Sequence, residues 1–460
     1  MPSPIQVAVI GGGISGLSCA YRIQKLGHSV LLFESHENPG GVIGTIEHNG
    51  FRFESGPQSF LATPPVLELI RDLNIESELI QANPRAPRYV FARGQLHSVP
   101  MSPQAILTSS LLSISSRYRI ATEPFRKTRP ADSDESVADF VRRKFGHEIL
   151  EYLVAPFVSG VYAGDPEMLS LKAAFPSLDQ WEREHGSVIR GAMGARKSQA
   201  GPRPALCSFR SGLATLLQSM SRTLGAALVS GTRVDAIEKT STSDGGGFTL
   251  RFSQGNQREM VTVPAVVVAA PAYVASHLLA AISPRAAQLL SGVSYAPVGV
   301  VATAYKRLQV ANSLVGFGVL IPRKEGRRTL GTVWNSSLFP GCAPADSVLL
   351  TSFVGGATDT DIFTDDDDFI MSLVESEISR IFEISGPPVE HHLWRHPKAL
   401  PQYNLGHGHI VESVREEINQ TPGIFLAGNY LEGPSFGHCV ERSNATAATA
   451  SSYLQSRKSA

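Results

Sequence analysis

The sequence predicts an α/β protein with an additional α+β portion, and three observations support this fold class. A strand pattern, a glycine-rich turn and a helical pattern open the chain between Gln6 and Gly27. The middle of the chain is mostly helical, and strand patterns return from about Cys207. A last strand and a last helix follow near the end. With 460 residues, 42% of them hydrophobic, the chain can form cores for two or three domains.

The N-terminal segment predicts one βαβ unit. The strand QVAVI leads into the turn GGGISG, the helix LSCAYRIQKLG has its apolar residues on one face, and the strand HSVLLFE follows. Residues 64 to 80 and 136 to 160 also show helical periodicity. The section between these two segments is basic and serine-rich, and carries Arg117, Arg119, Arg126, Lys127 and Arg129.

Strand patterns dominate the second half of the chain. The stretches LVSGTRVDAIEKT, FTLRFS and MVTVPAVVVAAP are rich in β-branched residues, which predicts a hairpin or meander. Between residues 297 and 396 strands alternate with the helix DDDFIMSLVESEISRIF, which predicts a mixed sheet covered by helices. The strand GIFLAG and a helix that starts near Gly437 complete the pattern.

Composition argues against several classes of function. Basic and acidic residues number 41 each, so the chain lacks the broad positive charge of a nucleic-acid-binding protein. The four cysteines are far apart and form no CxxC pair. His391, His392, His407 and His409 lack partners at metal-ligand spacing, so no metal site is predicted. No signal peptide or membrane-spanning helix is recognised, and we expect a cytoplasmic protein.

The turn GGGISG has the features of a Rossmann-like nucleotide-binding site. Gly11 permits the tight turn, Gly13 lets a pyrophosphate approach the backbone, and Gly16 allows close packing of helix against strand. Phosphates would lie at the helix N-terminus, where free N–H groups favour anions. Glu34 ends the second strand, where its carboxylate can accept both hydroxyls of a ribose.

Two further segments favour FAD as the dinucleotide. The doublet Gly40-Gly41 offers a second close backbone approach soon after the first. Near the chain's end, the strand GIFLAG leads through Asn429 to a second helix N-terminus. A positive helix dipole beside a flavin ring would stabilise the negative charge of the reduced ring.

These segments resemble the FAD-dependent amine oxidase superfamily, and several other motifs are similar to protoporphyrinogen oxidases. The motifs occur in the same order along nearly the whole chain, and they are GPQSF, PFVSGVYAGDP, EREHGSVIRGA, GFGVLIP, SSLFPG, PQYNLGH and AGNYLEG. The resemblance implies an FAD-binding domain built from residues 1–85, 205–275 and 400–460. It also implies a mixed-sheet substrate domain of residues 86–102 and 276–399, and a helical domain of residues 103–204 that is a candidate for membrane association.

The resemblance also implies the residues of the site. The expected FAD contacts are Gly11, Gly12, Gly13, Ile14, Ser15, Gly16, Glu34, Ser35, Gly41, Val42, Gly56, Pro57, Gln58, Ser59, Val234, Gly428, Asn429, Phe436 and Gly437. The expected porphyrinogen contacts are Arg88 or Arg93 to a propionate, Phe317 and Leu320 around the pyrrole rings, and Gly164 near the macrocycle. Of the two arginines, Arg88 is the first choice. No catalytic acid or base is identified.

The implied activity is the FAD-dependent oxidation of protoporphyrinogen IX to protoporphyrin IX, with dioxygen as acceptor and hydrogen peroxide as by-product. Coproporphyrinogen III remains open as the substrate, as does another reaction of the superfamily. A carrier of the same fold that acts on prenylated proteins without catalysis is a further alternative. Peripheral membrane contact and a homodimer are also left open.

Overall fold

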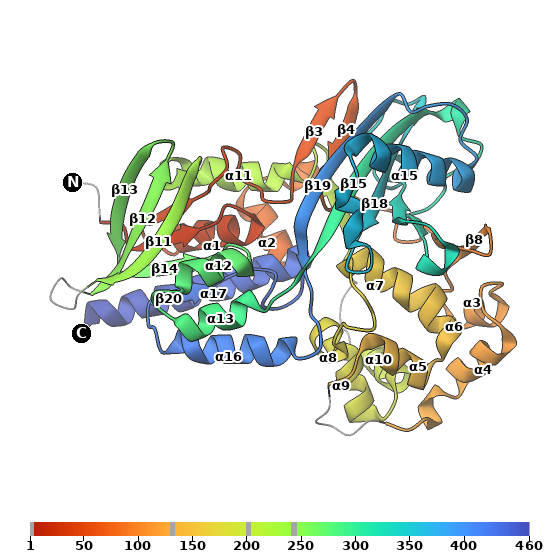
Figure 1. Ribbon diagram of the computed structural model, residues 1–460, viewed down its shortest axis with the longest axis horizontal. Coiled ribbons are helices and arrows are strands. Elements are labelled where there is room, and N and C mark those ends of the chain that lie inside the picture. The colour runs from red at the N-terminus through yellow and green to blue at the C-terminus, as the bar shows by residue number, and fades with distance from the viewer. Residues whose placement is uncertain (1–3, 129–133, 199–203, 241–245, 460) are drawn as a thin grey trace.

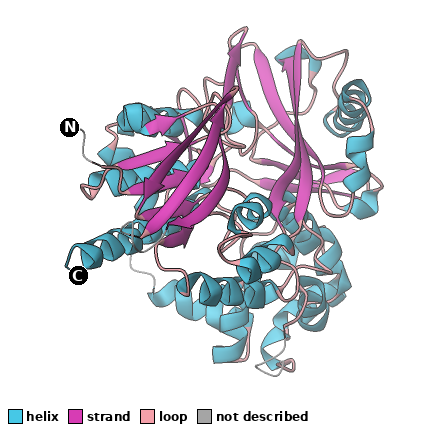
Figure 2. Cartoon of the chain, turned by 60° about the vertical axis from the view of Figure 1, so that its left-hand side comes forward, coloured by secondary structure: helices cyan, strands magenta, loops and turns pink. Residues whose placement is uncertain are grey.

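The computed structural model describes residues 4–128, 134–198, 204–240 and 246–459, so Arg129 of the predicted basic section lies outside these ranges. Figure 1 shows three regions: a sheet with helices at the left, a larger sheet at the upper right and a group of helices below it. In Figure 2 the strands of both sheets stand side by side above the helices. Both ends of the chain lie on the left in Figure 1.

The first sheet is parallel throughout, with the strand order β10-β2-β1-β14-β20. Its strands come from distant parts of the chain: β1 (Val7–Ile10), β2 (Val30–Phe33), β10 (Leu228–Val229), β14 (Ala265–Val268) and β20 (Ile424–Leu426). All residues of β1 and β14 are buried, because both faces of this sheet are covered. The predicted βαβ unit and the discontinuous assembly of this region are confirmed.

Alternate residues of β1 belong to two different cores. Val7 and Val9 pack with one group of helices, which consists of α1 (Ile14–Lys25), α2 (Pro64–Asp72), α11 (Ala214–Leu224) and α17 (Phe436–Ser459). Ala8 and Ile10 pack on the opposite face. That face is covered by the meander β11 (Thr232–Thr240), β12 (Gly247–Gln254) and β13 (Gln257–Val263), and by α12 (Ala272–Leu279), α13 (Pro284–Ser291) and α16 (His407–Asn419).

The second sheet has the strand order β19-β15-β18-β17-β16-β7-β8, and only the β16–β7 pair is parallel. Its strands are β7 (Arg88–Ala92), β8 (Gln95–Ser98), β15 (Tyr295–Lys306), β16 (Gly318–Leu320), β17 (Thr329–Val333), β18 (Ser347–Gly355) and β19 (Glu390–Pro401). The helix α15 (Asp367–Phe382) packs on it through Ile370, Val374 and Ile378. The mixed sheet with a helical cover is therefore confirmed.

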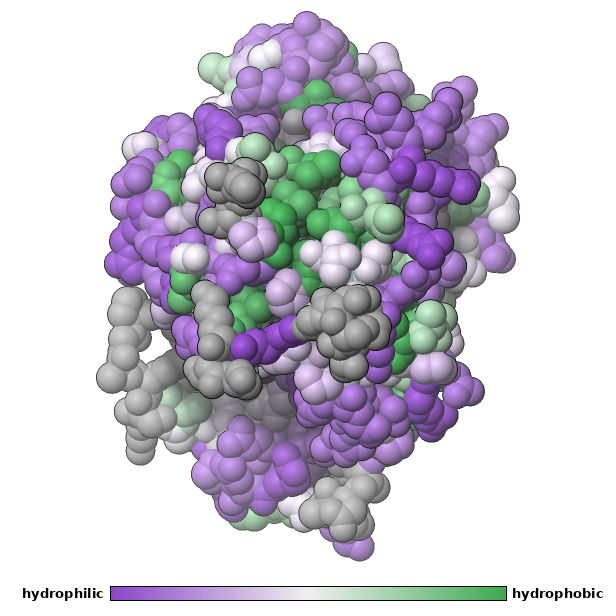
Figure 3. All heavy atoms as spheres, turned by 90° about the vertical axis from the view of Figure 1, so that its left-hand side faces the viewer, coloured by the Kyte–Doolittle hydropathy of each residue, from purple (hydrophilic) through white to green (hydrophobic). Residues whose placement is uncertain are grey.

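Short elements connect these two regions. They are the hairpin β3 (Thr45–His48) and β4 (Phe51–Glu54), the small sheet of β5 (Phe60–Leu61), β9 (Leu206–Phe209) and β6 (Leu79–Gln81), and α14 (Asn335–Leu338). The face of the first sheet's region, which Figure 3 shows, is mostly hydrophilic with a hydrophobic area near its middle.

The third region is helical, as predicted. It contains α3 (Pro103–Thr108), α4 (Ile114–Ala121), α5 (Val137–Lys144), α6 (His147–Ile149), α7 (Ala155–Tyr162), α8 (Leu171–Ala174), α9 (Pro176–His185) and α10 (Val188–Ser198), with a π-helical turn at Leu150–Val154 between α6 and α7. Among the described residues, no helix is both long enough and apolar enough to span a membrane.

A buried ion cluster joins the helices of this region. Lys144 is fully buried, and its Nζ lies 2.9 Å from Glu182 Oε1 and 3.4 Å from Glu123 Oε1. Glu123 in turn accepts hydrogen bonds from the backbone N–H groups of Val188 and Ile189, at the start of α10. Burial acts to raise the pKa of Glu182, but Arg143 and Lys144 outweigh it and hold that pKa below its usual value. The cluster therefore fixes α5, α9 and α10 relative to one another.

Candidate dinucleotide and substrate site

The three fingerprint glycines differ in what surrounds them. Gly11 has a φ of +107°, and a Cβ there would lie 2.9 Å from the carbonyl oxygen of Ala269. A Cβ on Gly16 would overlap the carbonyl oxygen of Gly11. A Cβ on Gly13, in contrast, would meet no atom of the described chain within 4 Å. Packing therefore explains Gly11 and Gly16, whereas Gly13 faces open space at the N-terminus of α1.

Glu34 lies beside this turn. Its carboxylate accepts hydrogen bonds from the backbone N–H of Gly12 at 2.6 Å and of His36 at 2.8 Å, and the side chain of Ser35 donates a third. Burial acts to raise the pKa of Glu34, but the two backbone donors and the hydrogen bonds of Ser35 and His36 outweigh it and lower the pKa. A buried carboxylate that stays ionised is suited to accept hydroxyl groups.

The Gly40-Gly41 doublet, predicted as a second close backbone approach, lies against the first glycine turn. Gly40 N–H donates to the carbonyl of Gly12 at 2.9 Å, and a Cβ on Gly41 would lie 3.6 Å from the Cα of Gly13. Gly56 packs directly against the residue that follows the doublet, since a Cβ on Gly56 would overlap the carbonyl oxygen of Val42. Residues 41–42 and 56–59 are therefore neighbours in space.

Gln58 is held by hydrogen bonds of its side chain, and Val234 lies on a strand that begins beside Glu34. Gln58 donates to the carbonyl of Gly56 at 2.8 Å and accepts from Asn335 Nδ2 at 2.6 Å. Val234 is buried on β11, two residues after Thr232, whose N–H donates to the carbonyl of Glu34 at 2.7 Å. The start of β11 is thereby placed next to Glu34.

The end of the chain completes this arrangement. The helix α17 begins at Phe436, whose ring stacks on Phe60 with centroids 5.0 Å apart. Further along, Ser443 Oγ donates to the carbonyl of Ser15 at 2.8 Å. A Cβ on Gly437 would lie 2.9 Å from Thr63 Oγ1, which explains a glycine there. The first turn of α1 is thus packed against α17 at Ser443, and the first turn of α17 is packed against Phe60 and Thr63.

Two residues that were not predicted as site residues hold the loop before α17. Tyr403 donates its hydroxyl to the carbonyl of Asn429. His407 Nε2 donates to the carbonyl of Tyr430 at 2.9 Å, and burial lowers the pKa of His407 to about 4, so its ring is neutral near pH 7. Both residues belong to the motif PQYNLGH, which lies 20 to 30 residues before the loop. At that separation, no local sequence pattern indicates that the motif contacts the loop.

These features fit a dinucleotide such as FAD. An ionised buried carboxylate and an open position at Gly13, at the N-terminus of α1, occur where the sequence placed the ribose and the pyrophosphate. The N-terminus of α17 is the helix end that was expected beside the flavin ring. The residues that would hold the cofactor are those of the Gly11–Gly16 turn, Glu34, the Gly41 and Gly56 segments, and the Gly428 to Gly437 segment.

On the substrate side, the fold brings Arg88 and Phe317 together. Gly318 pairs with Arg88 across the parallel strands β16 and β7, and the Arg88 guanidinium lies 5.3 Å from the centroid of the Phe317 ring. Leu320, on the same strand as Gly318, faces Gly160 of α7, where a Cβ would lie 2.6 Å from Leu320 Cδ2. Within the described ranges, Arg88 makes no ion pair.

Arg93 lies in different surroundings. It occupies the turn between β7 and β8 with a φ of +54°. Its Nη2 donates to Glu148 Oε1 at 2.9 Å, and its guanidinium lies over the ring of Tyr152 at 5.0 Å. Arg93 therefore already has a counter-ion, whereas Arg88 has none among the described residues.

Gly164 lies at the junction that follows α7. Ala163 ends α7 in the left-handed conformation with a φ of +47°, and its carbonyl accepts from Ala357 N–H at 2.7 Å. A Cβ on Gly164 would lie 3.0 Å from Gln402 Oε1. The junction connects the helical region to both other regions, and the contact of Gly164 with a macrocycle stays a prediction.

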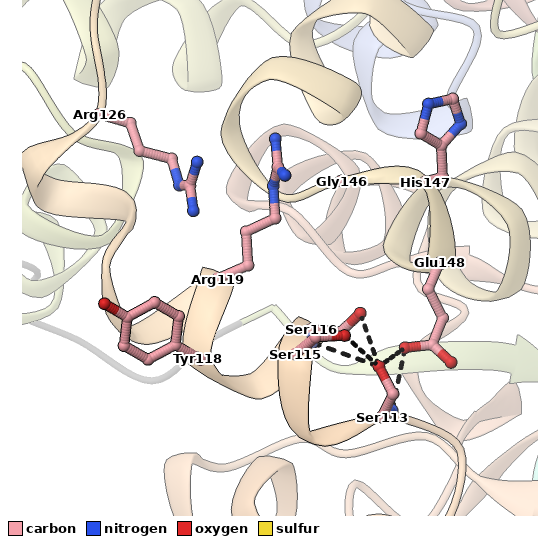
Figure 4. Close-up of a pocket in the computed structure, with 9 residues that line it drawn as sticks. All are labelled: Ser113, Ser115, Ser116, Tyr118, Arg119, Arg126, Gly146, His147 and Glu148. Atoms are coloured by element: carbon pink, nitrogen blue, oxygen red, sulfur yellow. Dashed lines mark hydrogen bonds between the residues drawn. The ribbon is translucent and has the colours of Figure 1, made fainter.

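A separate pocket of about 490 Å³ lies in the helical region (Figure 4). Its lining includes Ser113, Arg119, Arg126, His147 and Glu148, none of which is a predicted site residue. Figure 4 shows the side chains of Arg119 and Arg126 projecting into the same space. This pocket is distinct from the dinucleotide site.

Solved structures share the fold of this chain. A crystal structure of a protein from Exiguobacterium sp. 255-15 has a TM-score of 0.82 at 23% identity, and the match covers 98% of this chain and 99% of that protein. Reduced UDP-galactopyranose mutase has a TM-score of 0.70 at 17% identity, with 98% and 99% covered. At these identities the likeness shows the fold alone.

Sequence relatives are more similar. The chloroplastic protoporphyrinogen oxidase of Oryza sativa subsp. japonica is 35% identical over 97% of this chain and 88% of its own length. Protoporphyrinogen oxidase 1 of Arabidopsis thaliana is 33% identical with the same coverage. The coproporphyrinogen III oxidase of Bacillus subtilis (strain 168) is 29% identical over 97% of this chain and 98% of its own.

The family described as "Flavin containing amine oxidoreductase" matches residues 14–452. This range begins at Ile14, within the glycine turn, and includes Gly16, Glu34, the Gly40-Gly41 doublet and the Gly428 to Gly437 segment. The chain belongs to the family of flavin-containing amine oxidoreductases, which confirms the resemblance drawn from the motifs and the FAD cofactor inferred from them.

Proposed function

We propose that this protein oxidises protoporphyrinogen IX to protoporphyrin IX, with FAD as cofactor and dioxygen as acceptor. Removal of six electrons and six protons reduces three dioxygen molecules to three molecules of hydrogen peroxide. The observation that carries the proposal is the 33–35% identity to plant protoporphyrinogen oxidases over 97% of the chain. Protoporphyrin IX, the product, would enter heme and porphyrin biosynthesis.

The residues of the chain have binding and orienting roles in this proposal. Bound FAD supplies the two-electron redox chemistry. Arg88 binds a propionate of the substrate through its guanidinium, and Phe317 lies beside a pyrrole ring. Leu320 and the buried α7 junction exclude water from the apolar macrocycle. The N-terminus of α17 stabilises negative charge near the flavin.

Coproporphyrinogen III is the alternative substrate, because the Bacillus subtilis relative is named for it. Its four propionates need more cations than the two of protoporphyrinogen IX. Of the two candidate arginines, Arg93 is paired with Glu148 and only Arg88 is free within the described ranges. This favours the substrate with fewer carboxylates.

The test is a comparison of both porphyrinogens with the purified flavoprotein under air. The rise of porphyrin fluorescence gives kcat/KM for each substrate, and we expect protoporphyrinogen IX to be preferred. Preference for coproporphyrinogen III would replace the proposed substrate with the alternative. Flavin reduction by an amine, with neither porphyrinogen oxidised, would assign the chain to another reaction of the family.

We further propose a cytoplasmic protein that contacts a membrane surface through its helical region. Three side chains of this region are strongly exposed although apolar or aromatic: Ile114 at 81%, Tyr118 at 69% and Phe125 at 83%. Replacement of Ile114 and Phe125 by serine should reduce sedimentation with vesicles and leave turnover in detergent unchanged. Equal sedimentation of variant and wild type would reject this surface.

A further inference from the structure

Three side chains of types that can ligate a metal meet where the tip of the β3–β4 hairpin lies against β19. We propose that His48, Glu390 and His392 bind a divalent transition-metal ion such as Zn²⁺, which fastens the hairpin to the edge strand β19. His48 Nδ1 lies 3.2 Å from Glu390 Oε2, and His392 Nε2 lies 4.0 Å from the same oxygen. The three ligand atoms all lie within 4.8 Å of one another.

The donor set and its spacing fit such an ion. Two imidazoles and one carboxylate are ligands that zinc commonly takes, with water in the fourth position. Bonds of about 2.0–2.1 Å in a tetrahedral site place ligand atoms about 3.3 Å apart, so a shift of about 1.5 Å or less closes the site. The side chain of His48 is 55% exposed at the hairpin tip and is free to make this shift.

His392 is held with an unused nitrogen in this cluster. Its Nε2 is buried and has no hydrogen-bond partner among the described residues. The ring stacks on Trp394 with centroids 5.6 Å apart, and it contacts Phe53 of the hairpin at 4.5 Å. A buried polar atom without a partner is costly, and coordination of a metal ion would remove that cost.

The neighbouring side chains Asn49 and His391 do not occupy the ligand atoms that would bind the ion. Asn49 donates its side-chain amide to Glu390 Oε1, which orients the carboxylate and leaves Oε2 toward both histidines. His391, the next residue on β19, points to the opposite face and bonds to Glu375 at 2.8 Å. It therefore provides a matched control on the same strand.

The β3–β4 hairpin links the proposed metal site to the segments that are predicted to contact FAD. The hairpin connects the Gly41-Val42 segment to the segment of Gly56, both of which are predicted FAD contacts. Figure 1 shows the hairpin standing beside β19, and His396 of β19 also bonds to the carbonyl of Ser55 at 2.7 Å. A bound ion would restrain the segment between these two cofactor contacts.

This proposal differs from the sequence prediction of no metal site. The sequence placed His391 and His392 side by side and offered no third ligand at a usual spacing. The third ligand is His48, which lies 342 residues before Glu390 in the chain. Only the packing of the hairpin against β19 brings it near.

The experiment uses the full-length flavoprotein after removal of metals by a chelator. Isothermal titration with Zn²⁺ alone should give one ion per chain, and His48→Ala and His392→Ala should each weaken binding by roughly 100-fold. His391→Ala should bind as wild type does. Zn²⁺ should raise the melting temperature of wild type and of His391→Ala, but not that of His48→Ala.

Specific outcomes would overturn the proposal. These are wild-type protein that takes up no Zn²⁺ at one per chain, or His48→Ala that binds as tightly as wild type. Because His48 is exposed, its alanine variant should fold even if His392→Ala does not. Visible absorption of bound Co²⁺, lost in His48→Ala and kept in His391→Ala, provides a second readout that does not depend on activity.

Discussion

Gly13→Val isolates the pyrophosphate contact from the stability of the fold. The backbone of Gly13 is extended, with a φ of −73° and a ψ of −178°, so valine can adopt it without strain. Apart from the adjoining residues and the nearby backbone of α1, no atom of the described chain lies within 4 Å of the added Cβ. Valine at this helix N-cap should lower the unfolding free energy of the apoprotein by about 1 kcal/mol or less.

The effect on the cofactor should be much larger, because the side chain occupies the space of the pyrophosphate. Loss of two hydrogen bonds from backbone N–H groups to charged phosphate oxygens costs at least about 3 kcal/mol, which weakens FAD binding by more than about 100-fold. The purified variant should therefore be nearly colourless.

The assay compares visible flavin absorbance per protein chain, followed by titration of the apoprotein with FAD. Circular dichroism during denaturant unfolding measures the stability of the same samples. Gly16→Val is the matched control, since its Cβ would overlap the carbonyl oxygen of Gly11 and should reduce folding itself. A Gly13→Val protein that retains wild-type flavin content would refute the placement of the pyrophosphate at this turn.

Three other predictions concern the substrate, acid stability and the buried ion cluster. Arg88→Ala should raise KM for porphyrinogen about tenfold or more with flavin content unchanged, and the same effect in Arg93→Ala alone would show that the wrong arginine was chosen. The folded pKa of His407, about 4, lies below its usual value of 6.5, so its neutral form contributes stability above pH 6.5 that is lost as the pH falls toward 4. Relative to His407→Gln, wild type should lose about 3 kcal/mol of unfolding free energy over this interval in urea titrations, and equal losses in the two proteins would contradict this role of His407. Lys144→Ala should lower the unfolding free energy by about 3–5 kcal/mol in the same urea titrations, because Glu123 and Glu182 then remain buried without their cation. A decrease under 1 kcal/mol would contradict a stabilising role of Lys144.

Local sequence patterns were sufficient for the glycine turn and its surroundings. The spacing of Gly11, Gly13 and Gly16 after a buried strand predicted the turn, and Glu34 lies beside it as expected. The doublet Gly40-Gly41 was predicted as a second close backbone approach for the cofactor, and the structure adds that Gly40 bonds to Gly12. These features depend on residues within one βαβ unit and its immediate continuation.

Contacts between distant segments could not be predicted in this way. Lysine is almost always exposed, so nothing in the sequence indicated that Lys144 is buried between Glu123 and Glu182. The support of Asn429 by Tyr403 likewise depends on how β19 and the last loop pack. Roles for Arg88, Leu320 and Gly164 rest on the resemblance, since no local pattern separates a ligand contact from an ordinary surface or core residue.

The contact of α17 with α1 has a consequence for the order of events during synthesis. Ser443 and Ser15, which join the two helices, are 428 residues apart, and β20 joins the first sheet from the same late part of the chain. The glycine turn and α1 therefore leave the ribosome long before α17, which packs against α1, has been synthesised. On the proposed role of the Gly428 to Gly437 segment, we expect complete FAD binding only after this segment has been synthesised. Until the distant strands and helices have packed on β1 and α1, the apolar faces of these two elements need protection from aggregation.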